Sequence, residues 1–184
     1  MTKSSGGSKM RSTKHGFKGS RSAVPKKSLG GRALEVQLAS FIKKFEPNTA
    51  KLIRDCRSEI RRMLPAAIEL VYDNYNFFVI GYSSTERASD CIVSIAAAAN
   101  GVGLSFYWGA NLPDPANILQ GSGKQNRFIR LPNLDVLRMR EVIRLVKTAA
   151  IQGKTPLALN GVGYLVIKSV SSKQRPRRST NNAS

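Results

Sequence analysis

A series of strand-like segments between residues 69 and 131 constrains the fold of this chain more than any other feature. Aromatic and β-branched residues dominate several of these segments, and Asn, Gly, Ser or Asp stand in the gaps, as is typical of strands joined by turns. Because short gaps leave no room for crossover helices, they favour antiparallel neighbours over βαβ units. The predicted strands cover residues 69–72, 76–82, 91–97, 102–108 and 127–131.

The stretch between Asp90 and Asp114 carries no charge and is long enough to cross a membrane. However, Asn, Gly and Pro residues interrupt it, and Asn100-Gly101 between two apolar runs is a signal for a β-hairpin. We therefore expect two buried strands joined by a turn, and no membrane partner.

Helical periodicity flanks the strand series on both sides. Apolar residues recur at helical spacing within residues 34–45, and again after Pro47 up to about residue 64. Residues 134–152 predict a further helix, and residues 163–170 predict a last strand at an edge of the sheet. This order of elements predicts an α+β two-layer sandwich with an N-terminal helical pair, an antiparallel sheet of five to six strands and a C-terminal helix.

The chain has two cysteines, Cys56 and Cys91, and one histidine, His15. Both cysteines lie in apolar-periodic segments, so we expect buried free thiols in a reducing cytoplasm. His15 lies in a Gly-, Ser- and Lys-rich segment, which argues against Cys–His or Ser–His catalysis, and the same counts exclude zinc sites built from Cys and His. We expect a cytoplasmic protein that is not an enzyme and holds no cofactor.

The formal net charge of +19 is unevenly distributed along the chain. Residues 1–32 contain nine Lys and Arg, residues 173–184 contain four, and neither segment contains an acid. Residues 33–172 contain 17 basic and 11 acidic residues. Because the end segments lack apolar content, we expect disordered basic tails at 1–32 and 172–184 around one folded domain at 33–171.

Two interpretations of these tails stay open. They either keep the protein soluble or attract nucleic acid, or another polyanion, without sequence specificity. In the second interpretation the C-terminal contacts are Arg175, Arg177 and Arg178.

A glycine-containing segment between residues 119 and 127 has the residue types of an anion site. Two glycines allow backbone N–H groups to converge on an anion, and two basic side chains add charge. The segment lacks the phosphate-loop spacing, so a plain loop leading into a strand is the alternative. The candidate anion-binding residues are Gly121, Ser122, Gly123, Lys124 and Arg127.

Carboxylates offer a second kind of candidate site. Strand alternation places Glu69 and Asp73 on the same side of the first predicted strand, beside Tyr72 and Tyr75. This pair is the carboxylate grouping to test for a metal, as an alternative to anion binding.

Motifs in a fixed order along residues 38–178 resemble the YdhG-like family of small bacterial domains. They are Phe41-Ile-Lys-Lys-Phe45, Ile60-Arg-Arg-Met-Leu-Pro65, Leu104-Ser-Phe-Tyr-Trp-Gly-Ala-Asn-Leu112, Pro113-Asp-Pro115, Leu119-Gln-Gly-Ser-Gly-Lys124, Arg127-Phe-Ile-Arg-Leu131 and Lys173-Gln-Arg-Pro-Arg-Arg178. The resemblance implies a frataxin-like α+β fold and, for one described member, an iron chaperone. A frataxin-like iron surface is an acidic helix, because iron ions favour oxygen ligands. The second predicted helix here is instead rich in Lys and Arg.

These observations favour a YdhG-like, non-enzymatic binding module for an anionic ligand or polyanion. Two alternatives remain: a frataxin-like iron-binding protein that uses Glu69 and Asp73, and an unrecognised enzyme. The sequence predicts neither the ligand nor the oligomeric state.

Overall fold

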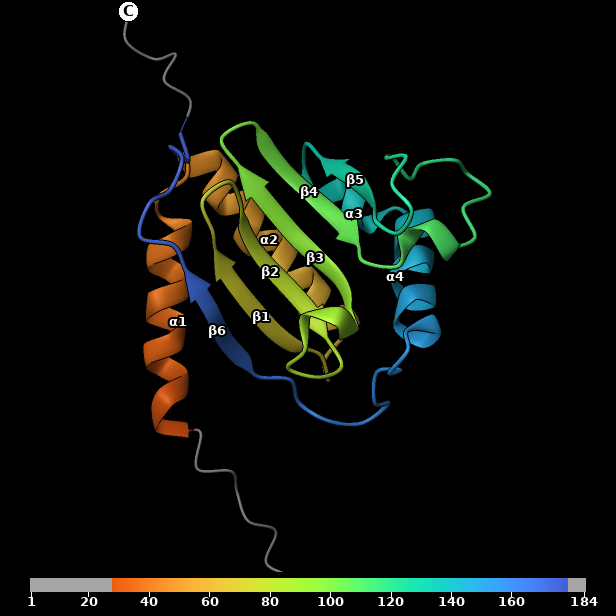
Figure 1. The fold of residues 1–184 in the computed structure, drawn as a ribbon, viewed down its shortest axis with the longest axis horizontal. Coiled ribbons are helices and arrows are strands. Elements are labelled where there is room, and N and C mark those ends of the chain that lie inside the picture. The colour runs from red at the N-terminus through yellow and green to blue at the C-terminus, as the bar shows by residue number, and fades with distance from the viewer. Residues whose placement is uncertain (1–27, 179–184) are drawn as a thin grey trace, which may run out of the picture.

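The computed structural model describes residues 28–178, which form a six-stranded sheet with helices on one face (Figure 1). The strand order across the sheet is β5-β4-β3-β2-β1-β6. The strands are β1 (Ile68–Asp73), β2 (Phe78–Ser83), β3 (Cys91–Ala98), β4 (Gly101–Phe106), β5 (Arg127–Leu131) and β6 (Leu165–Val170). The α+β class predicted from the sequence is confirmed.

Strands β1 to β5 form an antiparallel meander in which each strand pairs with the next one along the chain. The uncharged stretch forms β3 and β4, joined by a tight turn at Ala99 and Asn100, so the predicted hairpin is confirmed. Gly101 follows that turn with a φ of +124°, a conformation that L side chains rarely adopt.

β6 makes the sheet mixed, because it pairs in parallel with β1 at the edge. The chain leaves β5 at the opposite edge, runs through two helices and a long loop, and returns beside β1 (Figure 1). The wholly antiparallel sheet predicted from the sequence is therefore wrong at this one strand. The prediction came from the short gaps between the earlier strands, whereas two helices and a long loop separate β5 from β6.

Helices α1 (Ser28–Ile42) and α2 (Pro47–Met63) form the predicted N-terminal pair. α1 begins at Ser28, so residues 28–32, which we expected in the N-terminal tail, are helical. Gly30 and Gly31 lie in its first turns, and their low helix propensity explains why the sequence places the start later. Residues 1–27 of that expected tail lie outside the described residues.

The predicted helix at 134–152 is broken at Met139 into α3 (Leu134–Arg138) and α4 (Arg140–Gln152). Asn133 caps α3, and its side chain accepts hydrogen bonds from the N–H groups of Asp135 and Val136. The break allows α3 to pack against α2 and β5 while α4 packs against β3. It also turns Met139 outward, with 43% of its surface exposed.

One hydrophobic core lies between the sheet and the helices. Ile53, Cys56 and Ile60 of α2 are fully buried beneath the sheet, in the positions that the helical spacing predicts. In Figure 1, α2 lies behind the strands, and α1 and α4 lie toward opposite edges of the sheet.

Residues 171–178, which we call the C-terminal strap, run back over the end of the sheet that carries the β1–β2 turn. Ser171 N–H donates to Asp73 O at 2.9 Å, and Arg175 N–H donates to Tyr75 O at 2.9 Å. The guanidinium of Arg177, 5% exposed, donates to Asn76 O at 2.9 Å and lies over the Phe45 ring. The expected disordered tail from residue 172 is therefore wrong as far as residue 178, and residues 179–184 lie outside the described part.

Candidate functional site

The sheet has one covered face and one open face. Side chains such as Val71, Ile80 and Ile95 point into the core, while their strand neighbours alternate to the other side. Among residues 28–178, no α-helix lies in front of that second side, which faces the viewer in Figure 1; only the segment between β2 and β3, with the short 3-10 helix η1 (Ala88–Asp90), lies over its lower end. We call it the open face.

A trough runs along β3 and β4 in the open face. Its floor consists of small side chains and glycines, which are every second residue of each strand and pair across from one another. These residues leave little side chain above the backbone. The hollow encloses about 440 Å³. The floor residues are Ser94, Ala96, Ala98, Gly101, Gly103 and Ser105.

Larger side chains form the two walls of the trough. Phe77 and Val79 rise on the β2 side, and Phe128 and Arg130 rise on the β5 side. The strand register places Val79, Ala96, Gly103 and Arg130 in one row across the sheet. Phe77 is a large apolar side chain with 51% of its surface exposed, in contrast to the buried Phe78 beside it.

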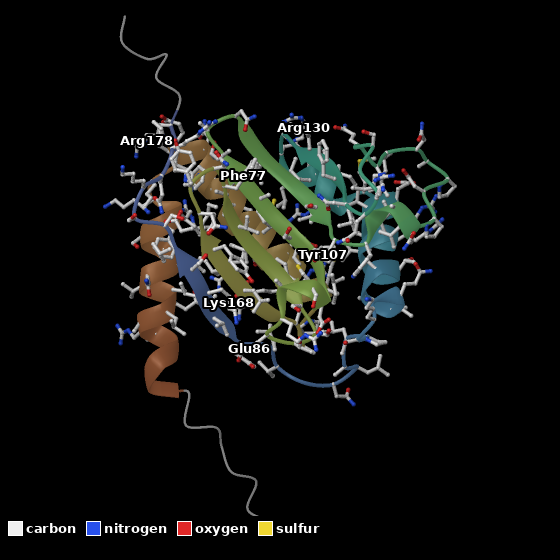
Figure 2. All side chains as sticks on the ribbon, in the orientation of Figure 1. Phe77, Glu86, Tyr107, Arg130, Lys168 and Arg178 are labelled. Atoms are coloured by element: carbon white, nitrogen blue, oxygen red, sulfur yellow. The ribbon has the colours of Figure 1, made fainter. Side chains whose placement is uncertain are left out.

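The trough continues into a second hollow at the end of the sheet near the strap. Phe77, Ala98 and Asn100 line both hollows, and Arg175 of the strap lines the second. The Arg175 guanidinium lies 5.6 Å from the centre of the Tyr75 ring, within the range of a cation–π contact, which orients it beside Phe77. Figure 2 shows Phe77 and Arg130 near the end of the sheet that carries the β3–β4 turn.

No carboxylate of the described residues lines the trough or its continuation. Three other hollows of the same chain each contain at least one: Asp90 in the first, Asp55 and Asp135 in the second, Asp114 and Glu141 in the third. The trough and its continuation therefore combine arginines, aromatic rings and small polar groups without a carboxylate in their lining.

The predicted anion loop lies beside β5, and its Arg127 side chain turns back onto the loop. The Nη1 of Arg127 donates hydrogen bonds to the carbonyls of Gly123 and Asn126, so this guanidinium is occupied by the loop itself. Gly121 has a φ of +102° and lies against the Phe128 ring. Ser122 and Lys124 are exposed. The start of the loop pairs with β5 through a bridge between Gln120 and Phe128.

The three arginines predicted to contact a polyanion lie in different environments. Arg177 is buried in an ion pair with Asp73, with 3.1 Å between Nη2 and Oδ1. The prediction that Arg177 contacts a polyanion is therefore wrong. Arg175 and Arg178 are exposed, and only Arg175 lies beside the trough.

The two carboxylates proposed for a metal are buried on the core side of β1, and each is already neutralised. Glu69 accepts from Arg57 through both oxygens, at 2.9 and 2.6 Å. Asp73 accepts from Lys44 at 2.5 Å and from Arg177. Within residues 28–178 there is no group of three or more His, Cys, Asp or Glu side chains that could hold a metal ion.

Arg57 links three elements through these carboxylates. It also donates to both oxygens of Glu35 on α1, at 2.7 and 2.6 Å, so one guanidinium joins α1, α2 and β1. The hydrogen bond from Arg57 lowers the pKa of Glu35, even though partial burial acts in the opposite direction. The network is structural, because both carboxylate oxygens of Glu35 and both of Glu69 already accept hydrogen bonds from Arg57.

The two thiols are poor nucleophiles in this structure. Burial raises the pKa of both Cys56 and Cys91 to about 12, so the thiolate is scarce at neutral pH. Cys56 is fully buried, as the sequence predicts, while Cys91 is partly exposed and donates to Val93 O at 3.2 Å.

Sequence reasoning missed the trough, although its signal was present. Ser94-Ile-Ala96-Ala-Ala98 and Gly101-Val-Gly103-Leu-Ser105 alternate small residues with apolar ones. In a sheet that is covered on one side, such alternation places every small residue on the other side.

No family model, curated protein or solved structure matches the chain, so the resemblance to the YdhG-like family rests on the quoted motifs alone. Within the described residues, no helix is both long enough and apolar enough to span a bilayer.

Proposed function

We propose that this protein binds nucleic acid through the open face of its sheet. The observation that carries the proposal is the trough itself, an uncovered hollow with arginines at its edges and no carboxylate in its lining. Lys and Arg that neutralise phosphates release counterions, which provides most of the free energy of sequence-independent nucleic-acid binding.

The charge of the rest of the molecule supports the same proposal. The described residues 28–178 contain 22 Lys and Arg against 11 Asp and Glu. A positive surround of this kind increases the encounter rate with a polyanion, and the trough gives the encounter a defined place to end.

The first prediction concerns the floor of the trough. We expect Ala96→Glu to weaken binding of a labelled oligonucleotide about tenfold or more, because a carboxylate facing phosphates is strongly unfavourable. Fluorescence anisotropy measures the dissociation constant of the full chain. Ala39→Glu on the exposed side of α1 is the matched control, and it should bind like the wild type.

Salt dependence separates phosphate contacts from other effects. Arg130→Gln should reduce the slope of log affinity against log salt by about 0.7 for a single strand, while Arg54→Gln on the exposed surface of α2 should leave it unchanged. Wild-type affinity and slope in both Ala96→Glu and Arg130→Gln would show that the open face does not bind nucleic acid.

A further inference from the structure

We infer that the open face takes single-stranded nucleic acid in two nucleotide subsites, each made of one phenylalanine ring and one arginine. The first subsite is Phe77 with Arg175, and the second is Phe128 with Arg130. The inference rests on the proposed function and names the substrate class of the same surface.

The subsite at Phe77 combines an exposed ring with a positioned cation. The Phe77 ring is half exposed, although burying such a ring is strongly favourable, so this surface offers free energy to a planar partner. Arg175 lines the same hollow; its backbone N–H donates to Tyr75 O, and its guanidinium lies over the Tyr75 ring. A base on the ring brings the phosphate of the same nucleotide within reach of this guanidinium.

The subsite at Phe128 repeats this combination on β5. Phe128 and Arg130 are two residues apart on one strand, so their side chains leave the same face of the sheet about 7 Å apart. Phe128 pairs with Ser105 across β4, and Ser105 donates a hydrogen bond of 2.8 Å to Asn126. Each subsite therefore has a flat apolar surface, a cation and nearby polar groups.

The two rings lie diagonally across the trough. Phe77 directly precedes β2 and Phe128 lies on β5, three positions across the sheet. Their rows are four residues apart along β3, so the two positions are roughly 14 Å apart across the strands and 13 Å apart along them. One base cannot contact both rings. A single strand laid over the small floor residues can place different bases on the two rings.

Stacking also determines which form of nucleic acid fits. In a duplex the base faces are stacked on one another, so they are not available to the two phenylalanine rings. A single strand exposes its base faces, and aromatic side chains stack on them with little dependence on sequence. The subsites therefore favour single strands, whether RNA or DNA.

The test compares aromatic with aliphatic side chains in the full chain. Phe77→Leu and Phe128→Leu keep apolar bulk and remove the ring, and each should weaken binding of an oligothymidylate of roughly 15 nucleotides about 5- to 100-fold. Phe77→Tyr keeps a ring and should retain wild-type affinity. Tyr164→Leu, an aromatic position before β6 and outside the lining of the trough, is the control and should bind normally.

An abasic strand of the same length supplies the phosphates without the bases. We expect the wild type to bind it more weakly than oligothymidylate, and Phe77→Leu to bind it as the wild type does. Photocrosslinking of a bromodeoxyuridine strand should label peptides that contain Phe77 or Phe128. Equal affinity for the abasic strand, or for a duplex of the same length, would overturn the two subsites.

Failure of this inference differs from failure of the proposed function. If Ala96→Glu and Arg130→Gln weaken binding but the two leucine variants do not, the open face binds phosphates without stacking bases. If neither set has an effect, both proposals are wrong. An acidic peptide that competes for the trough while no oligonucleotide binds would also contradict both.

Discussion

Two arginines, Arg57 and Arg177, differ from the other basic residues of the described part, 28–178, because they are largely buried. Arg57 lies between Glu35 and Glu69, and Arg177 lies between Asp73 and backbone carbonyls. Buried ion pairs stabilise little compared with apolar replacements, but removing one partner leaves an uncompensated charge. These side chains therefore fix α1 and the strap in place and do not contribute to the charge available to a ligand.

The second carboxylate partner of Arg57 has a measurable pH signature. Because the hydrogen bond from Arg57 lowers the pKa of Glu35 below its ordinary value of 4.5, this group contributes stability above that pH. The contribution is lost as the pH falls through the lowered folded-state pKa. We expect Glu35→Gln to destabilise the protein at pH 7 and to match the wild type at strongly acidic pH.

Urea unfolding at a series of pH values measures this difference. Glu46→Gln, which removes the same charge at the N-terminus of α2 where the side chain makes no capping bond, is the control. A difference between wild type and Glu35→Gln that does not shrink as the pH falls would contradict the assignment.

At the scale of secondary-structure elements, the position of β6 depends on Gly163, which lies two residues before the strand begins. A Cβ on Gly163 would lie 1.8 Å from the carbonyl oxygen of Ala67, so any side chain requires the backbone to move. The N–H of Gly163 donates to Pro65 O at 2.8 Å, and that bond holds the strand beside β1. We expect Gly163→Ala to lower the stability of the protein by about 2 kcal/mol or more, the range of strained backbone sites.

Chemical denaturation measures this loss, and Gly123→Ala is a matched control. A Cβ on Gly123 meets no atom within 4 Å, so that substitution should change the stability little. Equal stability of Gly163→Ala and wild type would show that β6 can shift without cost.

The elements themselves were largely predictable, for reasons that particular residues make clear. Six strands were predicted, several of them from β-branched and aromatic runs, because half-buried strands select those side chains. The parallel pairing of β6 with β1 was not predictable. It depends on where the chain emerges from α3 and α4 relative to the sheet, which the local sequence does not indicate. The break at Met139 was also missed, because no proline or glycine marks it and tertiary packing imposes it.

The candidate site was less predictable than the fold. Composition directed attention to glycines with basic neighbours at 121–127, but Arg127 turns back to its own loop. The trough instead depends on Ala96 and Gly103 facing the same way across two strands, which only the register reveals. Phe77 and Phe78 are adjacent in sequence, and strand alternation alone decides which of them is exposed.

At the scale of the whole molecule, the structure changes where the charge belongs. With the helix beginning at Ser28 and the strap ending at Arg178, the described part carries a net charge of +11, and residues 1–27 carry eight Lys and Arg without an acid. More of the charge therefore lies on the fold than the sequence segments alone indicated. Both parts contribute to attraction, but only the fold provides the rings of the two subsites.

This division leads to a prediction about residues 1–27. A chain that begins at residue 28 should lose affinity for single strands and should show a smaller salt slope, because up to eight phosphate contacts are removed. The relative effect of Phe77→Leu should stay the same in the shortened chain, since stacking is a short-range contact that counterion release does not replace.

Binding isotherms at several salt concentrations, with and without Phe77→Leu, form a double-mutant cycle for the two contributions. Additive free energies would place the N-terminal residues and the trough at independent contacts along one strand. A leucine effect that disappears with residues 1–27 would instead mean that the basic segment carries the binding and that the open face only lies nearby.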